Sequence, residues 1–403
     1  MTQIKILFID QSIKDGGGGR SLFYILKFIN KNAFEPIAYL PDEEGVLPER
    51  IEKEGVCELI REPLLHSSNK VARLKKKAAD ENIFERIYSL VLNYAELFYL
   101  TFFKLPSLVK KRSIDILYAN NITTRMMAGF VGLVTGCKVV WHSRDVPSGK
   151  DRVIQKFLAR RHPLKKVICV SENNRRFFPS PAEKSIVVHN GIDAEEFNSV
   201  TITKKLRNEF HIPQNAVVFG VTGRILPKKG YASFLRAGKI ASENCPEIPL
   251  RFVIAGGAFK EQQQQHFDEL KQLAKTLQIE DRVIFTGFIA DVKSYVNDFD
   301  ALVAPSEWEE PCPRTVLEGM ALNLPVLGFK MGGIPELVAN GETGLLYDCA
   351  DYKGLADGMI TLIRDPQLRK TMGQKGRKRI ENFFDIVEKT KEIDRILLEV
   401  DSH

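Results

Sequence analysis

The chain has 403 residues, with 58 Lys and Arg against 51 Asp and Glu, and 44% of its residues are hydrophobic. No apolar run approaches the roughly 20 residues of a membrane span, so the composition predicts a soluble globular protein of about two domains. Residues 1–190 hold 31 basic against 20 acidic residues, a net charge of +11, and the remainder carries −4. This imbalance predicts an anionic partner for the first half, either a membrane surface or a phosphorylated acceptor.

The N-terminus runs directly into an apolar strand pattern at residues 4–9, which is too short for a signal peptide. We therefore expect a cytoplasmic protein that could sit peripherally on the inner face of the cell membrane. Six scattered cysteines form no CxxC pair, which favours reduced thiols over disulfides or a metal site.

Short apolar runs alternate with helical stretches along the chain, which predicts parallel sheets with helices on both faces. The first set comprises residues 4–9, 36–40, 56–60, 116–119, 139–142, 167–170 and 186–189. After about residue 193 the second set comprises residues 217–221, 251–255, 282–285, 301–304, 326–329 and 344–347. The sequence therefore predicts two doubly wound α/β domains, whose ligands bind beyond the C-terminal ends of the strands.

Four consecutive glycines, Gly16 to Gly19, lie between the first strand and the first helix. They would let the backbone approach a ligand closely and present helix amides to an anion, so we expect Gly17 and Gly18 to contact a phosphate group. A flexible turn is the alternative. The segment is not a dinucleotide fingerprint, because no suitable acidic residue follows the second strand.

Residues 67–112 interrupt the strand rhythm. An apolar, aromatic stretch at 83–105 is flanked by basic residues at 70–77 and at 110–112. This pattern fits a helix that lies at a membrane interface. An ordinary core helix stays open as the alternative, because periodicity does not separate the two.

Polar residues follow two strands of the first half. Asn120 and Asn121 follow the fourth strand, while His142 and Arg144 close the fifth. A histidine just past a parallel strand reaches into the ligand site, and a buried structural histidine is the competing interpretation. The position favours a functional role.

In the second half, Gly223 and Arg224 follow the first strand and Lys229 stands at the start of the next helix. Two cations at one strand end would repel each other, so they indicate an anion between them. After the third strand, Gly287 and Phe288 offer a place where a base could lie against the backbone.

The stretch 304–327 combines a buried strand, a proline-containing loop and a helix that we expect to begin near Arg314. The amides of residues 314–316 (Arg314, Thr315 and Val316) would then form a site for a diphosphate. Glu310 precedes this site and Glu318 lies one turn inside the helix. Each carboxylate could accept hydrogen bonds from a pair of hydroxyls, as on a sugar and a ribose, although such spacing also occurs by chance.

In this order the chain resembles the retaining nucleotide-sugar transferases of glycosyltransferase family 4. The resemblance rests on Gly16–Gly19, His142, Asn190–Asp193, Arg224 with Lys229, Glu310 with Glu318, Gly332–Glu336 and Asn340–Gly344. It implies a GT-B architecture of two Rossmann-like domains that face each other across a cleft. The acceptor domain would span residues 1–195 and the donor domain 196–375. In residues 376–403, a final helix near 386–400 would cross back to the first domain.

The resemblance also implies roles for the residues named above. Arg224 and Lys229 would bind the donor diphosphate, Glu318 the ribose and Glu310 the sugar, with His142 beside the transferred sugar. His142, Arg224, Lys229 and Glu310 are therefore the predicted catalytic residues. The other predicted donor contacts are Gly17, Gly18, Asn190, Gly223, Gly287, Phe288, Arg314, Thr315 and Val316, and the acceptor candidates are Asn120, Asn121 and Arg144. The chain departs from many relatives at Pro313, where they have a glycine.

The resemblance, together with these features, implies a retaining hexosyltransferase that uses a nucleoside diphosphate sugar and needs neither metal nor cofactor. The acceptor would be a hydroxyl of a glycan or a lipid-linked glycan, in surface polysaccharide synthesis of the bacterial type, with no nucleic acid partner. Two alternatives stay open: a nucleotide-sugar epimerase of the same architecture, and a non-catalytic scaffold at the membrane.

Overall fold

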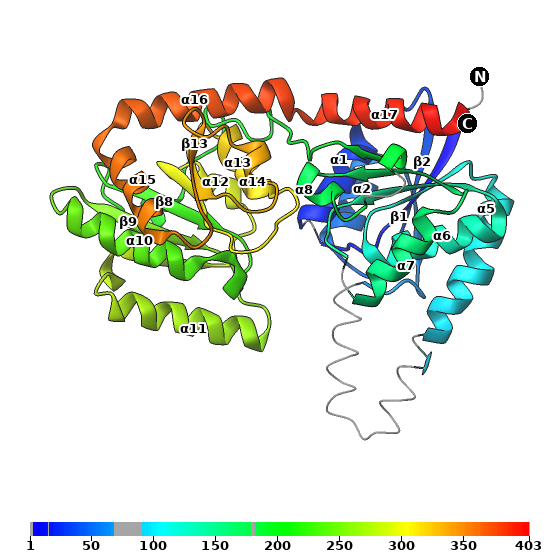
Figure 1. Cartoon of the computed structure of the whole chain (residues 1–403), viewed down its shortest axis with the longest axis horizontal. Helices are drawn as coiled ribbons and strands as arrows, with labels where there is room; N and C mark the ends of the chain where they lie inside the picture. The colour runs from blue at the N-terminus through cyan, green and yellow to red at the C-terminus, as the bar shows by residue number, and fades with distance from the viewer. Residues whose placement is uncertain are drawn as a thin grey trace. The chain divides into compact units, whose positions relative to one another are not determined.

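The computed structural model describes residues 3–14, 16–67, 91–92, 94–147, 149–178 and 182–402. The chain forms two compact units, one of Met1–Asn190 with Ile386–His403 and one of Gly191–Asp385 (Figure 1). It therefore leaves the first unit, passes through the second, and returns with its final helix α17 (Ile386–Ser402). Among the described residues, no helix has the length and apolarity that a membrane crossing requires.

Unit 1 contains a seven-stranded parallel sheet in the order β3-β2-β1-β4-β5-β6-β7. Its central strands are almost wholly apolar because helices cover both faces of the sheet. The strands are β1 (Ile4–Ile9), β2 (Phe34–Pro41), β3 (Glu58–Glu62), β4 (Ile116–Ala119), β5 (Lys138–Ser143), β6 (Leu164–Cys169) and β7 (Ser185–Val187).

Two buried clusters fill the two faces of this sheet. On one face α17 contributes Ile393, Ile396 and Leu397, which pack in the same cluster as Phe8 and Leu22. The other cluster joins the sheet to the remaining helices of residues 100–159. The helices of unit 1 are α1 (Gly17–Phe28), α2 (Val46–Glu54), the π-helix η1 (Leu100–Lys104), α5 (Leu105–Arg112), α6 (Ile122–Thr135), α7 (Gly149–Ala159), α8 (Glu172–Arg175), the short 3-10 helix η2 (Ala182–Lys184) and α17.

Unit 2 contains a six-stranded parallel sheet in the order β10-β9-β8-β11-β12-β13. The strands are β8 (Val217–Thr222), β9 (Leu250–Ala255), β10 (Val283–Gly287), β11 (Ala301–Ala304), β12 (Val326–Phe329) and β13 (Gly344–Tyr347). The helices are α9 (Leu206–Glu209), η3 (Pro227–Lys229), α10 (Tyr231–Asn244), α11 (Glu261–Thr276), η4 (Glu280–Arg282), α12 (Val292–Val296), α13 (Arg314–Ala321), α14 (Ile334–Leu337), α15 (Tyr352–Arg364) and α16 (Pro366–Phe383).

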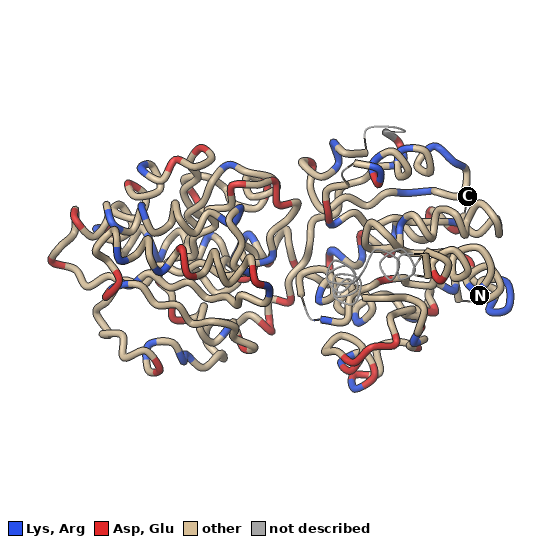
Figure 2. Tube along the Cα trace, turned by 90° about the horizontal axis from the view of Figure 1, so that it is seen from below, with Lys and Arg blue, Asp and Glu red and all other residues tan. Residues whose placement is uncertain are grey.

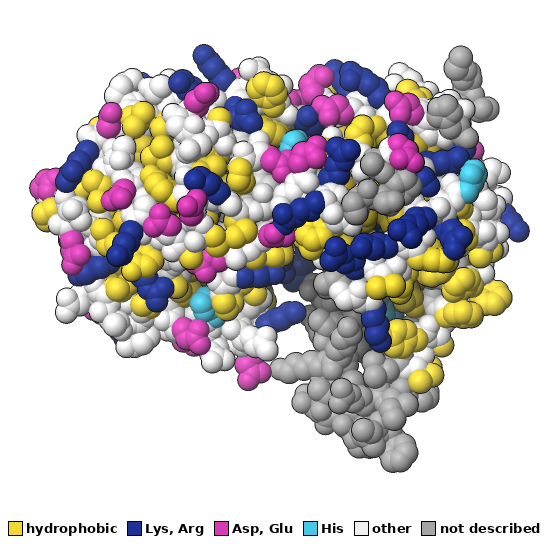
Figure 3. Space-filling model, viewed as in Figure 1, with side chains coloured by type: hydrophobic (Ala, Val, Ile, Leu, Met, Phe, Trp, Pro, Cys, Tyr) yellow, Lys and Arg dark blue, Asp and Glu magenta, His cyan; other side chains and the backbone are white. Residues whose placement is uncertain are grey.

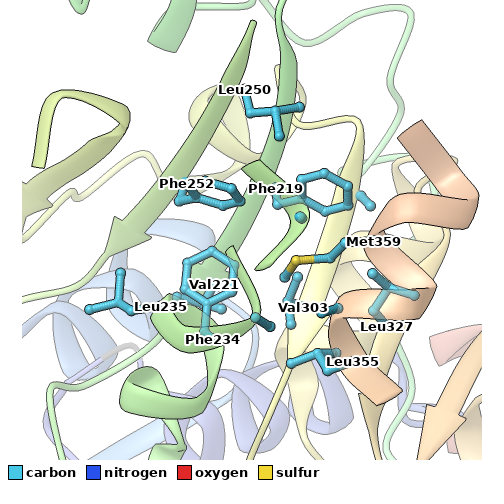
Figure 4. Close-up of a cluster of buried hydrophobic side chains, with 14 of the residues drawn as sticks. Phe219, Val221, Phe234, Leu235, Leu250, Phe252, Val303, Leu327, Leu355 and Met359 are labelled. Atoms are coloured by element: carbon cyan, nitrogen blue, oxygen red, sulfur yellow. The ribbon is translucent and has the colours of Figure 1, made fainter. Parts of the chain in front are cut away.

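The core of unit 2 is built around aromatic rings that project from β8, β9 and α10 (Figure 4). The Phe252 ring centroid lies 6.3 Å from that of Phe219 and 5.9 Å from that of Phe234, the latter in an edge-to-face arrangement. Met359 of α15 and Leu327 of β12 complete this layer. The packing fixes the ends of β8 and β11, from which the site described below extends.

Two doubly wound α/β units were predicted from the sequence, and the structure confirms this fold. The predicted limits of residues 4–9, 116–119, 301–304, 326–329 and 344–347 coincide with β1, β4, β11, β12 and β13. All are short apolar runs bounded by polar residues, Gly or Pro, which is why their limits were readable.

Candidate active site

In unit 2, the loop after β8 holds the predicted cations. Gly223 has a φ of 141° and Gly230 a φ of 71°, which are both conformations that favour glycine. A Cβ at Gly230 would lie 1.8 Å from the carbonyl oxygen of Pro305, so this loop lies directly against the end of β11. Lys229 stands between these two glycines in η3, and Arg224 is exposed beside it.

The Lys229 ammonium contacts Glu310, the residue that was predicted to bind the sugar. Its Nζ lies 2.6 Å from Glu310 Oε1, and the same oxygen accepts a hydrogen bond from the Ser306 hydroxyl. The backbone of Glu310 is fixed too, because the Gly333 amide donates to its carbonyl oxygen over 2.8 Å. A Cβ at Gly332 would lie 2.2 Å from that same carbonyl oxygen. The segment around Gly332 therefore holds Glu310 against the loop after β8, which carries Arg224 and Lys229 and is called the cation loop below.

A third cation, which the sequence interpretation did not include, joins this group. The Lys228 ammonium lies 3.4 Å from the centroid of the Trp308 ring. The pKa of Lys228 is lowered, first by partial burial and then by the charges of Arg224 and Lys229. Three positive charges that oppose one another at one strand end form a site that an anion would stabilise.

The helix α13 begins at Arg314, as predicted, with Pro313 at its N-cap position. The prediction of three available amides is wrong for Val316, whose N–H donates to the Pro313 carbonyl over 3.2 Å. The first turn is tightened into a 3-10-type bond, which is common at helix ends. Thr315 still lines a small cavity with Thr222, Lys229 and Glu310.

The Arg314 side chain is buried within unit 2. Its Nη1 donates to the carbonyl oxygen of Gly191 over 3.2 Å, and its Nε lies 3.7 Å from Glu318 Oε1. Both side chains are largely buried. Arg314 therefore orients the carboxylate of Glu318 and balances its charge.

An exposed aromatic pair lies at the ends of β9 and β10. The Phe259 and Phe288 ring centroids are 5.4 Å apart in an edge-to-face arrangement, and both rings are more than half exposed. Gly287 has a φ of 70°, and a Cβ at Gly257 would lie 2.9 Å from each of these two aromatic side chains. The glycines thus allow the two rings to close on this edge of the sheet.

In unit 1, one guanidinium joins three of the predicted site residues. Arg144 donates to Asn120 Oδ1 over 3.4 Å, to His142 Nδ1 over 3.2 Å, and to Asn190 Oδ1. Asn120 follows β4, His142 lies near the carboxyl end of β5 and Asn190 follows β7, and the carboxyl ends of these parallel strands meet at one edge of the sheet. Arg144 was predicted as an acceptor contact, and the structure gives it a positioning role within this cluster.

His142 is held as a neutral ring. Its pKa is lowered well below 6.5, first by burial and then by the charges of Arg144 and Arg125. Because a guanidinium only donates, Nδ1 must accept, and the ring proton then lies on Nε2. That Nε2 is buried and has no hydrogen-bond partner among the described residues. The ring therefore carries an unused donor.

The remaining unit 1 candidates have largely structural surroundings. The Asn121 side chain accepts from the Thr124 amide over 3.0 Å and caps α6, which accounts for its place after the strand. The glycine run begins α1 at Gly17, and a Cβ at Gly19 would lie 2.3 Å from the Lys14 carbonyl oxygen. Gly18 has far more space, with its nearest neighbour at 3.9 Å.

The sequence interpretation missed Arg125, which supports this cluster from α6. Its fully buried guanidinium pairs with Asp145 over 2.5 Å and donates to the His142 carbonyl over 3.3 Å. Tyr118 of β4 also hydrogen-bonds His142 Nδ1. The available signal was an arginine inside an otherwise apolar helix, since a fully buried charge requires a partner.

The apolar insertion is only partly described. The basic residues 70–77 and the segment 83–90 lie outside the described residues. In the described part, Leu100 and Leu105 are buried, whereas Tyr94, Phe98, Tyr99 and Phe103 are exposed. Hydrophobic side chains gather on this described part of the insertion in Figure 3, and the same part is cyan in Figure 1. The segment is thus a core element on one side and an aromatic surface on the other.

Comparison with known proteins finds a family match for the second unit and a similar fold for the whole chain. Residues 202–379 match the family model described as glycosyl transferases group 1. The structure is similar to Anabaena HepE in complex with UDP, with a TM-score of 0.78, 25% identity and coverage of 98% of this chain and 100% of HepE. Two parallel-sheet units of this kind define the GT-B fold. The family match covers residues 202–379 and therefore most of the second unit, which is similar to the group 1 glycosyltransferases.

Curated relatives extend the similarity. The capsular polysaccharide biosynthesis glycosyltransferase CapM of Staphylococcus aureus is 31% identical over 196 residues, which are 48% of this chain and 49% of CapM. The chain thus spans about half the length of that relative. The UDP-Gal:alpha-D-GlcNAc-diphosphoundecaprenol alpha-1,3-galactosyltransferase of Escherichia coli is 24% identical over 315 residues, which are 73% of this chain and 78% of that enzyme.

Proposed function

We propose that this protein transfers a hexose-type sugar from a nucleoside diphosphate sugar to a hydroxyl of a glycan or lipid-linked glycan, with retention at the anomeric carbon. The observation that carries the proposal is the convergence of Arg224, Lys228 and Lys229 on the end of β8, beside the fixed carboxylate of Glu310. The family of unit 2 and the UDP bound by HepE support a nucleotide donor.

In this mechanism the bond between the anomeric carbon and the diphosphate oxygen breaks, and a bond to the acceptor oxygen forms on the same face. The leaving phosphate takes the acceptor's proton. Arg224 and Lys229 neutralise the charge that develops on the diphosphate, and the Thr315 amide at the start of α13 adds a dipole. Lys229 has three N–H donors, so its bond to Glu310 leaves two for phosphate oxygens.

We propose further roles for the neighbouring groups. Glu318, oriented by Arg314, binds the ribose hydroxyls, while Glu310 binds the sugar. The exposed rings of Phe259 and Phe288 offer an apolar surface to the base. In unit 1, the Nε2–H of His142 and the Nδ2 of buried Asn120, neither of which has a partner among the described residues, are donors for sugar hydroxyls.

The test is a panel of UDP and GDP sugars, read first by thermal shift, because a bound ligand raises the unfolding temperature with its saturation. The stabilising donor is then incubated with glycan and lipid-linked acceptors, and the anomeric configuration of the product is read by NMR. We expect an axial donor linkage to give an axial product linkage. Turnover of the donor to a stereoisomer without transfer would instead establish an epimerase, and binding without any turnover would establish a scaffold.

We also propose that no metal takes part. The charge that a metal would neutralise falls to the cations of the β8 loop in this mechanism. Transfer should therefore persist in excess chelator. Complete loss that added Mg²⁺ or Mn²⁺ restores would overturn this part of the proposal.

We propose that unit 1 docks peripherally on an anionic membrane through its aromatic surface, defined by Tyr94, Phe98, Tyr99 and Phe103. Lys110 and Lys111 are exposed on the following helix α5. Aromatic rings beside lysines suit a lipid interface, where each basic residue contributes about 1 kcal/mol. The lipid-linked acceptor named for the Escherichia coli relative gives such docking a purpose.

Co-sedimentation with phosphatidylglycerol vesicles at low and high salt tests the docking. We expect the parent to pellet at low salt, and the double variant Phe98→Ser, Phe103→Ser to stay in the supernatant. Phe383→Ser is the matched control, because Phe383 is exposed to the same degree in unit 2. Equal pelleting of all three proteins would show that the aromatic surface does not bind lipid.

A further inference from the structure

A separate cavity lies in unit 1 between α7 and residues 177–178. It has a volume of about 60 Å³ and is lined by Pro147, Arg152, Gln155, Lys156, Ala159, Arg160, Phe177 and Phe178. None of these residues belongs to the site described above. We call it the α7 cavity. Its volume is several times the roughly 10–15 Å³ that a cavity of this measure needs to hold one water, so a group of several atoms fits.

The charge of the α7 cavity is entirely positive. Arg152 and Lys156 lie one turn apart on α7, Arg160 directly follows its last residue, and the described lining includes no carboxylate. Among the residues that the structure describes, none forms an ion pair with these three side chains. Like charges at this spacing destabilise a helix. Lys and Arg side chains gather over this part of unit 1 in Figure 3, and Figure 2 shows them along the rest of the unit.

A buried amide lies among these cations. Gln155 is only 1% exposed, and neither its Nε2 nor its Oε1 has a hydrogen-bond partner within the described chain. A buried carboxamide without partners is costly, so such groups usually bind water or a ligand. Whichever way the amide is oriented, it needs one acceptor and one donor from its occupant.

The requirements of these groups define the occupant. Three cations call for an anion with several oxygens, and the Gln155 Nε2 can donate to one of them. The Gln155 Oε1 accepts a hydrogen bond, which a hydroxyl beside the phosphate would supply. Beside the cavity, α7 also exposes Val153 and Phe157, which are 69% and 48% exposed.

We propose that the α7 cavity binds a phosphate ester that carries a neighbouring hydroxyl. The same chemistry is present in a polyol phosphate in solution and in a glycerophospholipid headgroup at a membrane. Arg152, Lys156 and Arg160 contact the phosphate, and Gln155 contacts the phosphate and the hydroxyl together. The site is independent of the donor site in unit 2.

Calorimetric titration of the full chain with glycerol 3-phosphate tests the proposal, with UDP present in excess so that the donor site is occupied. We expect saturable binding to the parent. Gln155→Leu should weaken binding about tenfold, because it removes both hydrogen bonds while its size is nearly unchanged. It should not lower the unfolding temperature, since it also removes an unpaired buried amide.

The double variant Lys156→Gln, Arg160→Gln should abolish detectable binding. Its matched control is Lys370→Gln, Lys375→Gln, which removes the same charge from exposed positions of α16 in unit 2 and should bind like the parent. Equal binding by the parent, Gln155→Leu and the two double variants would overturn the site, as would the absence of binding to the parent. UDP affinity, measured in the same variants, should not change.

The two sources of the ester are separated with vesicles. If the ester belongs to a lipid, phosphatidylglycerol vesicles should pellet the parent better than Gln155→Leu, and glycerol 3-phosphate should compete. If the ester is a soluble compound, glycerol 3-phosphate binding should depend on Gln155 whereas vesicle binding should not. Either pattern supports the α7 cavity as a phosphate site.

Discussion

The polar groups of the two units differ in how they are held. In unit 2, three cations converge on one strand end with repelling charges, and Arg224 is open to solvent. In unit 1, His142 and Asn120 are buried, and one guanidinium ties them together. The first arrangement suits a charged group that must be neutralised, because its charges are in surplus. The second arrangement suits neutral hydroxyls, because the hydrogen-bond donors that it offers carry no charge.

The largest expected effect concerns the surplus charge of unit 2. Lys229→Ala should lower kcat/KM about a hundredfold, because a charge-assisted contact to the leaving diphosphate is lost. Steady-state kinetics with a saturating acceptor measure this. Lys239→Ala removes a charge from α10, where Lys239 pairs with Glu243, and it should leave kcat/KM unchanged. Normal kinetics in Lys229→Ala would show that the cation loop does not bind the donor diphosphate.

Loss of the hydrogen-bond donor that His142 supplies in unit 1 should have a smaller effect. His142→Ala should lower kcat/KM about tenfold to thirtyfold through the loss of one hydrogen bond to a hydroxyl. Because the pKa of His142 is held well below 6.5, its ring is neutral across pH 6–8. The ratio of parent to variant rates should therefore be constant over that range. A ratio that follows a titration near pH 6.5 would show that the ring acts as an acid or base.

Glu318→Gln separates ribose binding from the chemical step. The amide keeps the shape of the carboxylate and loses its charge, so the donor KM should rise about fivefold to tenfold with a smaller change in kcat. Affinity for UDP alone should fall by the same factor. Since Arg314 would lose its buried counter-charge, the unfolding temperature must be followed in parallel. Unchanged UDP affinity in a folded variant would exclude a contact with the ribose.

The smallest expected effect concerns a buried carboxylate of unit 1 and the dependence of stability on pH. Burial in unit 1 raises the pKa of Asp394 from 3.8 to about 6. The folded state therefore holds a proton that the unfolded state has lost, and the free energy of unfolding falls as pH rises through this interval. Asp394→Asn should stabilise the protein by about 1–2 kcal/mol at pH 7.5 and by almost nothing at pH 4. Chemical denaturation at the two pH values measures this, and equal effects at both would contradict the raised pKa.

Unit 2 was far more readable from the sequence than unit 1. Its cations and glycines are neighbours in the chain after β8, and Pro313 directly precedes α13, so local rules on turns and helix starts placed Lys229 and the first residue of α13 correctly. The Val316 amide was assigned wrongly, because the tightening of a first turn depends on the path of the chain before it.

The cluster of unit 1 is assembled by contacts across the fold. Arg144 and Asn190 are 46 positions apart, and Arg125 reaches His142 from another element. Strand order predicts that such residues share an edge of the sheet, but not which guanidinium binds which ring. Likewise, a polar residue after a strand can cap the next helix, as Asn121 does, or face a ligand, and the sequence alone does not decide between them.

The return of α17 to unit 1 also constrains how the protein is made. A ribosome completes the whole of unit 2 before it synthesises Ile393, Ile396 and Leu397, which cover part of one face of the unit 1 sheet. During synthesis the part of that face that α17 covers stays exposed while about 195 further residues emerge, which takes roughly 10–40 s at the usual 5–20 residues per second. The second unit to begin translation can therefore be the first to finish folding, and the early unit depends on protection from aggregation until its last helix arrives.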